Sequence, residues 1–155
     1  MIDNCFSDCS KVFSIQNNIL NEANFDAPLE NTLSSLTDAL DSLNPEYAVA
    51  ILRHTNEGLR PLAGNRISKN WAKLINPLPL GPNHGSCGTA GFLKQRVIVE
   101  NILEDPLWAD YREYQPIHGF MACWSQPIIN NRNELLGTLA IYFKNSRKPK
   151  HQELE

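Results

Sequence analysis

The stretch HGSCGTAGF, residues 84–92, places Cys87 among small residues at the expected start of a helix. If Ser86 caps this helix, Cys87 lies in the first turn, where free backbone N–H groups and the helix dipole lower the pKa of a thiol. A buried small side chain beside Gly88 explains the same residues, and we favour it because free cysteine is among the most buried residue types. A third interpretation needs no thiol chemistry, since successive amides in this turn form a nest for a carboxylate or phosphate.

A second group of residues has types suited to a ligand pocket. In the segment DPLWADYR, Trp108 and Tyr111 offer flat apolar surface, and Arg112 offers a charge that pairs with a ligand anion. Core packing with a surface charge explains these residues equally well. In the strand sequence FMACWSQPII, the alternation of side chains puts Trp124 and Gln126 on one face, and the polar Gln126 indicates a pocket there.

Histidine and cysteine residues raise the question of a metal or haem site. His84 and His118 belong to no spaced set of ligands, so we interpret both as loop histidines. Cys5 and Cys9 lack the further thiolates that an iron–sulfur cluster requires. No metal or haem is therefore predicted, and reduced thiols are the expected state of the four cysteines.

Periodicity and turn residues predict the elements that position these side chains. Leucines at gaps of four and three residues predict an amphipathic helix laid on a core, with a helical dimer seam as the alternative. Runs rich in β-branched and aromatic residues, separated by turn sequences such as NEG and NNRN, predict hairpins. The predicted helices cover residues 12–23, 29–43, 68–75, 86–94 and about 105–119, and the predicted strands cover 48–52, a return strand after 58, 96–101, 120–129 and 134–143.

The composition is that of an ordinary globular domain. The 155 residues suffice for one core, 42% are hydrophobic, and the net charge is only −3. This charge gives no basic field for nucleic acid, and no apolar run is long enough to span a bilayer. The element order predicts an α+β fold, a mostly antiparallel sheet with helices on its faces, in a cytoplasmic protein that makes no direct membrane contact.

The segments GSCGTA, VIVENI, DPLWADYR, ACWSQPI and LLGTLAIYF together resemble a bacterial GAF domain. The resemblance covers about half of the chain directly and fits the element order from Leu29 onward. It implies a sheet of about six antiparallel strands with a small-molecule pocket over one face. It also implies a sensory module, attached to a histidine kinase or a cyclic-di-nucleotide enzyme and acting as a homodimer.

The sequence departs from two well-known members of that family. The N-K…F…D-E signature of cyclic-nucleotide-binding members is absent, and SCG does not resemble the bilin-attachment setting. The GSCGTA turn is similar to that of free methionine-(R)-sulfoxide reductases, but the loop that carries HIAC in those enzymes has no cysteine here. A thiol enzyme of that kind, or a ligand-free dimerisation module, therefore remains the alternative to a sensor.

The predicted organisation is a lead-in segment over residues 1–26, a GAF domain over 27–144 and an exit linker over 145–155, with Leu154 and Glu155 as candidate vector residues. The predicted function is to sense a small molecule of unknown identity and to signal to a covalently attached output domain, with no catalysis by the domain itself. The candidate ligand-binding residues are His84, Ser86, Cys87, Trp108, Tyr111, Arg112, Trp124 and Gln126.

Overall fold

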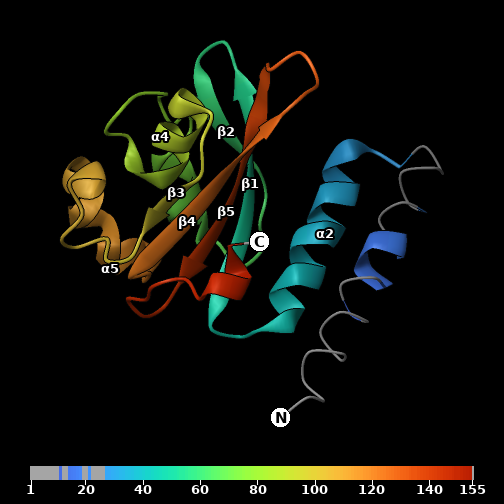
Figure 1. Cartoon of the computed structure of the whole chain (residues 1–155), viewed down its shortest axis with the longest axis horizontal. Coiled ribbons are helices and arrows are strands. Elements are labelled where there is room, and N and C mark those ends of the chain that lie inside the picture. Colours follow the sequence, from blue (N-terminus) through green and yellow to red (C-terminus); the bar gives the residue numbers. More distant parts are fainter. Residues whose placement is uncertain (1–10, 12–13, 19–20, 22–26, 155) are drawn as a thin grey trace.

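A five-stranded antiparallel sheet forms the centre of the molecule, in the order β2-β1-β5-β4-β3 (Figure 1). The computed structural model describes residues 11, 14–18, 21 and 27–154. Five strands in an α+β arrangement agree with the predicted sheet of about six. The strands are β1 Tyr47–Thr55, β2 Gly58–Ala63, β3 Val97–Val99, β4 Ala122–Ile129 and β5 Leu135–Phe143, and the helices are α2 Leu29–Leu43, α3 Lys69–Leu74, α4 Gly85–Leu93, the 3₁₀ helix η1 Pro106–Tyr114, α5 Gln115–His118 and the 3₁₀ helix η2 His151–Glu153.

Both predicted hairpins are confirmed. The turn at residues 56–57 joins β1 to β2, and the NNRN turn joins β4 to β5. Thr55 closes the first turn by donating its hydroxyl to the Gly58 carbonyl at 2.9 Å. Gly58 has a φ of +130°, and a Cβ on it would lie 2.4 Å from the Leu78 carbonyl oxygen, so only glycine fits this position.

The sheet has two faces of different character. Alternation along the strands places Ala50, Cys123 and Tyr142 on an inner face, which packs in the main core beneath α3, α4 and η1. The same alternation places Trp124 and Phe143 on an outer face, in a second and smaller apolar cluster. Figure 1 shows α2 on one side of the sheet, with α4 and α5 on the other.

Helix α2 covers the outer face over β1 and β2. Its most buried residues are Thr32, Thr37 and Asp41, while the predicted leucine stripe is only half-buried and Leu29 is exposed. Asp41 anchors the helix to the sheet, because its carboxylate accepts a hydrogen bond from the Val49 amide at 2.7 Å. Burial raises the pKa of this carboxyl group, against the effect of that hydrogen bond.

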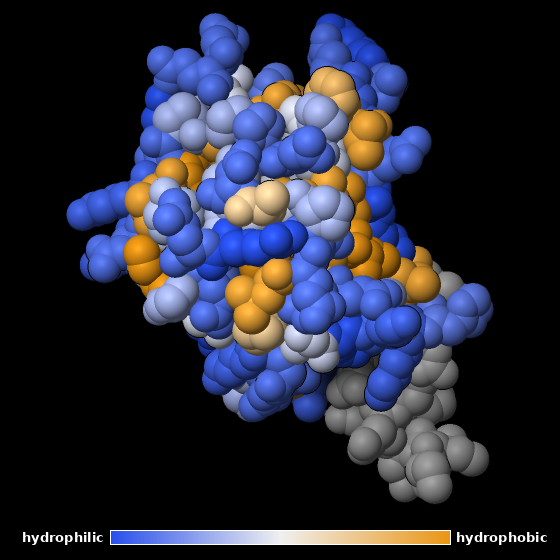
Figure 2. Space-filling view, turned by 90° about the vertical axis from the view of Figure 1, so that its left-hand side faces the viewer, coloured by the Kyte–Doolittle hydropathy of each residue, from blue (hydrophilic) through white to orange (hydrophobic). Residues whose placement is uncertain are grey.

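The opposite side of the molecule carries α4 and η1. The surface turned to the viewer in Figure 2 is mostly hydrophilic, with apolar side chains in separate groups. Within the part of the chain that the structure describes, no helix is long and apolar enough to cross a membrane. Of the predicted first helix, the described positions 14–18 and 21 are helical, and Cys5 and Cys9 lie outside the described residues.

Candidate functional site

Helix α4 contains the GSCGTAGF sequence, and its start differs from the prediction. The helix begins at Gly85, which has a φ of +62°, and His84 is the N-cap without a side-chain cap. The predicted capping role of Ser86 is therefore wrong, because this side chain lies inside the first turn and faces the core. Its hydroxyl donates to the Cys123 carbonyl at 2.8 Å and accepts from Nε1 of Trp108 at 3.0 Å. Ser86 thus ties α4 to both β4 and η1.

Cys87 lies against a second cysteine that the sequence did not pair with it. Cys87 is 3% exposed and Cys123 is fully buried, and both are free thiols. A hydrogen bond from the Cys123 thiol holds the pKa of Cys87 below its usual value, while burial raises the pKa of Cys123 well above its own. The pair is a buried dithiol in which Cys87 is the more acidic member.

The aromatic residues of the predicted site pack with rings from three other elements. We call the group formed by Trp71, Trp108, Tyr111, His118 and Tyr142 the aromatic compartment. The rings of Trp71 and Trp108 stack with their centroids 5.9 Å apart, and Tyr111 meets both edge-on. The space left beside these rings is about 10 Å³, close to the minimum for one water molecule. The compartment is therefore filled by its own side chains.

His84 closes this compartment at its outer end. Its Nδ1 lies 3.1 Å from the Tyr111 hydroxyl. A Cβ on Gly81 or Gly88 would lie 2.6 Å from an atom of the His84 ring or side chain, so two glycines make room for it. The structure thus brings together five predicted site residues, which are His84, Ser86, Cys87, Trp108 and Tyr111.

His118, interpreted from the sequence as a loop histidine, is instead the last residue of α5, and its ring is buried against Trp71 and Trp108. Its Nδ1 accepts a hydrogen bond from the Phe120 amide at 3.0 Å, so the proton of the neutral ring is on Nε2. Nε2 has no hydrogen-bond partner among the described residues, and the ring packs 4.7 Å from the centroid of Trp71. Burial lowers the pKa of His118 to about 4, so this side chain is neutral at pH 7.

The remaining three predicted residues lie elsewhere. Arg112 donates to the carbonyls of Glu104 and Asp105 at 3.0 and 2.9 Å, and so closes its own loop. Trp124 and Gln126 are on the outer face, where they line a groove of about 150 Å³ beside the C-terminal segment. The eight predicted residues therefore do not form one site.

Part of the outer groove is occupied by the chain itself. The Arg147 guanidinium lies 4.9 Å from the ring centroid of Trp124 and 4.8 Å from that of Phe143. Arg147 also pairs with both carboxylate oxygens of Glu153, at 2.7 and 2.6 Å. Arg96 donates to Gln126 and to the Leu154 carbonyl. These contacts hold the C-terminal segment against the outer face.

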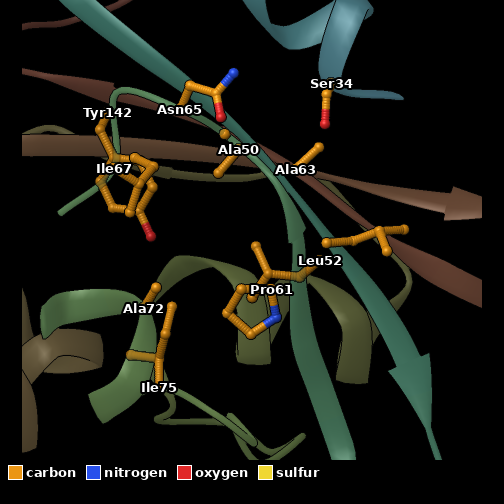
Figure 3. A pocket seen from close by; sticks show the side chains of 12 residues that line it. Ser34, Ala50, Leu52, Pro61, Ala63, Asn65, Ile67, Ala72, Ile75 and Tyr142 are labelled. Atoms are coloured by element: carbon orange, nitrogen blue, oxygen red, sulfur yellow. The ribbon is translucent and has the colours of Figure 1, made fainter. Parts of the chain in front are cut away.

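An open pocket of about 200 Å³ lies next to the aromatic compartment. Figure 3 shows the side chains that line this pocket. Its apolar walls come from three elements, β1, β2 and α3. Ile75 and Tyr142 line both spaces and form the wall between them. The main apolar lining residues of this open pocket are Ala50, Leu52, Pro61, Ala63, Ala72 and Ile75.

Three polar side chains from different elements also line the open pocket. They are Ser34 from α2, Asn65 from the loop after β2, and Tyr142 from β5. The Tyr142 hydroxyl accepts a hydrogen bond from Nε1 of Trp71 at 3.4 Å, and burial raises its pKa well above the usual value. This hydroxyl is therefore neutral, and it links the pocket to the aromatic compartment.

Comparison with known proteins agrees with this architecture. The sequence model of the GAF domain family matches residues 26–155. The chain belongs to the GAF domain family. The match covers most of the chain and includes all the elements that form the aromatic compartment and the open pocket.

Solved GAF-type structures share the fold at low sequence identity. The GAF domain of a phosphoenolpyruvate-protein phosphotransferase from Coxiella burnetii superposes with a TM-score of 0.72 at 20% identity, over 93% of this chain and 84% of that one. The fRMsr of Staphylococcus aureus, solved in complex with substrate, gives a TM-score of 0.69 at 13% identity, over 93% and 86%. At these identities the likeness concerns the fold alone.

One relative is similar in sequence. The methyl sulfide methyltransferase-associated sensor of Methanosarcina acetivorans is 32% identical over 142 residues, which is 90% of this chain and 14% of the relative. This GAF domain therefore spans about a seventh of the length of that sensor.

Sequence reasoning missed the open pocket of this GAF domain, because its walls are built from inconspicuous residues. Ala50, Ala63 and Ala72 carry no chemistry that a motif search would find. The one available signal is the sequence PLAGN at the end of β2, where Gly64 has a φ of +138° and begins the loop that carries Asn65. A Cβ on Gly64 would lie 2.9 Å from the Val49 carbonyl, so this loop must cross close to β1.

Proposed function

We propose that this GAF domain senses a small molecule bound in the open pocket and passes the change to an attached output domain through α2. One observation carries the proposal: the open pocket is lined both by α2 and by the sheet with α3. Among the described residues, Ser34 is the α2 residue that lines it, and the other walls come from β1, β2 and α3. A ligand there contacts the sheet and the helix together. Its binding energy then depends on how α2 sits on the sheet.

The loop after β2 strengthens this coupling. Asn65, which lines the pocket, donates its side-chain amide to both carboxylate oxygens of Asp38 on α2, at 2.8 and 2.9 Å. The next residue, Arg66, donates to the carbonyls of Asn44 and Tyr47 at 3.0 Å, and lies 3.8 Å from the Asp41 carboxylate. The pocket rim and α2 are therefore held by direct polar contacts.

A ligand shifts the output only if it binds one arrangement of α2 better than another. The relative from Methanosarcina acetivorans supports a sensory role by its name, and its greater length supports an output domain in the same polypeptide. We propose a histidine kinase or a cyclic-di-nucleotide enzyme as that output domain, and a cytoplasmic homodimer as the working form. Analytical ultracentrifugation tests whether the chain dimerises. A chain that stays monomeric at high concentration would contradict the proposed dimer.

Filling the pocket by mutation tests the coupling without knowledge of the ligand. Ala72→Leu adds apolar volume from α3, as an occupant of the pocket does. We expect hydrogen exchange of the α2 amides to change, because the added side chain pushes against the rim that holds α2. Ala109→Leu is the matched control, since Ala109 is exposed on η1. Identical α2 exchange in both variants and the wild type contradicts the proposed coupling.

The buried dithiol favours one alternative function. Structures of fRMsr share this fold, and the Cys87 and Cys123 thiols are adjacent here. In a sulfoxide reductase a thiolate attacks the sulfoxide sulfur, methionine leaves, and the second thiol converts the resulting sulfenic acid to a disulfide with loss of water, which an external dithiol then reduces. Turnover of free methionine sulfoxide that Cys87→Ser abolishes supports this alternative, and no turnover in the wild type removes it.

A further inference from the structure

We infer that the open pocket accepts a small, uncharged molecule that combines an apolar ring or chain with a hydrogen-bond donor, such as an alcohol, a phenol or an N–H group. This inference rests on the proposed sensory function and names the class of ligand for the same site. It follows from the charge, the polarity and the size of the pocket.

No charged side chain lines the pocket among the described residues. Apolar side chains from β1, β2 and α3 line it together with uncharged polar atoms, which make up as much of the exposed lining as the apolar ones. The polar side chains are the Ser34 and Tyr142 hydroxyls and the Asn65 amide, and all three are neutral. Burying an ion costs several kcal/mol or more when no opposite charge compensates it. The pocket lining therefore does not compensate the desolvation free energy of a charged ligand.

Asp38 determines which atom of Asn65 faces the pocket. A carboxylate only accepts hydrogen bonds, so the amide nitrogen of Asn65 must face Asp38, and it does so at 2.8 and 2.9 Å. The amide oxygen is then turned away from Asp38 toward Ala50 and the interior of the pocket (Figure 3). The pocket thus offers an acceptor at its rim, which selects a ligand with a donor. The carboxylate behind it further disfavours an anion.

The size of the pocket limits the ligand to roughly one ring. An apolar cavity of roughly 150 Å³ holds a benzene molecule. The open pocket, at about 200 Å³, has room for such a ring and a short polar substituent. In the proposed complex the ring contacts Leu52, Pro61 and Ile75, and the substituent donates to the Asn65 oxygen.

Four probes of nearly equal size separate these requirements. Benzyl alcohol is neutral with a donor, benzyl methyl ether is neutral without one, and benzoate and benzylammonium are charged. Binding to the whole chain is measured by calorimetric titration at pH 7. We expect benzyl alcohol to bind at least about 10-fold more tightly than each of the other three, which corresponds to about 1.4 kcal/mol. Ala72→Leu should remove this binding and Ala109→Leu should retain it.

Asn65→Ala tests the acceptor. This variant should reduce the preference for benzyl alcohol over benzyl methyl ether by at least about 3-fold while both neutral probes still bind, because it removes the rim oxygen and leaves the Ser34 and Tyr142 hydroxyls as the remaining side-chain acceptors. An unchanged preference overturns the role assigned to Asn65. Circular dichroism of the variant verifies that the fold is intact, and Asn145→Ala, at an exposed position after β5, provides the control substitution.

The outcomes distinguish the ligand class from the sensory function. If benzoate or benzylammonium binds more tightly than benzyl alcohol, and this binding is lost in Ala72→Leu, then the inference of an uncharged ligand is wrong. The proposal that the pocket is a sensory site still stands in that case. Binding that persists in Ala72→Leu places the probe elsewhere and overturns the inference. If no probe binds while Ala72→Leu still alters α2 exchange, the ligand class is wrong and the sensor stands. If neither response occurs, both proposals fail.

Discussion

Two compartments lie side by side on the inner face of the sheet, separated by Ile75 and Tyr142. The aromatic compartment leaves about 10 Å³ free, whereas the open pocket leaves about 200 Å³. The first is built from tryptophan, tyrosine and histidine rings, and the second largely from alanine, leucine and proline. Residues with the most evident chemistry therefore fill the space around them, and small residues leave the space that a ligand can use.

Substitutions in the two compartments should therefore affect stability and ligand binding differently. Large side chains in a filled region contribute packing energy, so their truncation is costly. Small side chains beside an open region contribute little packing energy, so their enlargement is tolerated but blocks a ligand. The predictions below test each side of the contrast.

The largest effect is expected in the aromatic compartment. Trp108→Ala removes a side chain that is 2% exposed, stacks on Trp71 and donates to Ser86. We expect a loss of about 3–5 kcal/mol in the free energy of unfolding, measured by urea denaturation. A loss below about 1 kcal/mol would show that the compartment is not tightly packed, and would make it a second candidate for ligand binding.

The buried imidazole of His118 should make stability depend on pH. Its pKa is about 4 in the folded protein and near 6.5 in an unfolded chain, so the unfolded state binds the extra proton as the pH falls through this window. The stabilisation is complete above about pH 6.5 and is lost as the pH falls toward 4, with a total of about 3 kcal/mol.

The variant His118→Gln isolates this effect, because its side chain does not titrate. Denaturation of both proteins at pH 5 and pH 7 gives two differences, and groups such as Asp41 contribute equally to each. We expect the wild type to lose more stability than the variant on acidification. Equal losses would mean that His118 is protonated in the folded protein and that the compartment admits water.

The features that could be predicted from the sequence also differ from those that could not. Local sequence patterns predicted the elements of the fold, but they did not predict the open pocket. The α+β fold, the two hairpins and the helix after Asp105 follow from local signals, including Asp105 itself, whose carboxylate accepts from the Leu107 amide at 2.9 Å. The segments HGSCGTAGF and DPLWADYR single out His84, Cys87 and Tyr111, and the structure places these three residues around one space. Local patterns of this kind indicate the backbone conformation of a segment and which of its side chains are buried.

Other features depend on tertiary contacts that no local pattern encodes. The pairing of Cys87 with Cys123 joins residues 36 positions apart and arises from the packing of α4 on β4. The open pocket depends on where α3 and the loop after β2 lie over β1. Trp124 shares a motif with Cys123 but faces the opposite side of the sheet, because side chains alternate along a strand.

A matched pair of alanines compares the two regions directly. Ala50 and Ala140 are cross-strand partners on the inner face, but only Ala50 lines the open pocket, and Ala140 is fully buried in the core. Ala140→Val should cost about 1–3 kcal/mol by overpacking, and Ala50→Val less than about 0.5 kcal/mol. Urea denaturation measures both. Equal costs would indicate that the pocket is closed in solution.

An effect smaller than those of Trp108→Ala and Ala140→Val is expected at the wall between the compartments. Ile75 is 4% exposed and lines both, so Ile75→Val removes one methyl group from the wall and should cost about 0.5–1.5 kcal/mol in unfolding free energy. The same change enlarges the open pocket, and we expect a bulkier probe, 4-methylbenzyl alcohol, to gain affinity relative to benzyl alcohol. Ile117→Val, the same change at an exposed position of α5, is the matched control. A stability loss of about 0.5–1.5 kcal/mol without any change in probe preference would mean that Ile75 packs only in the aromatic compartment. The boundary of the ligand site would then lie nearer to β2.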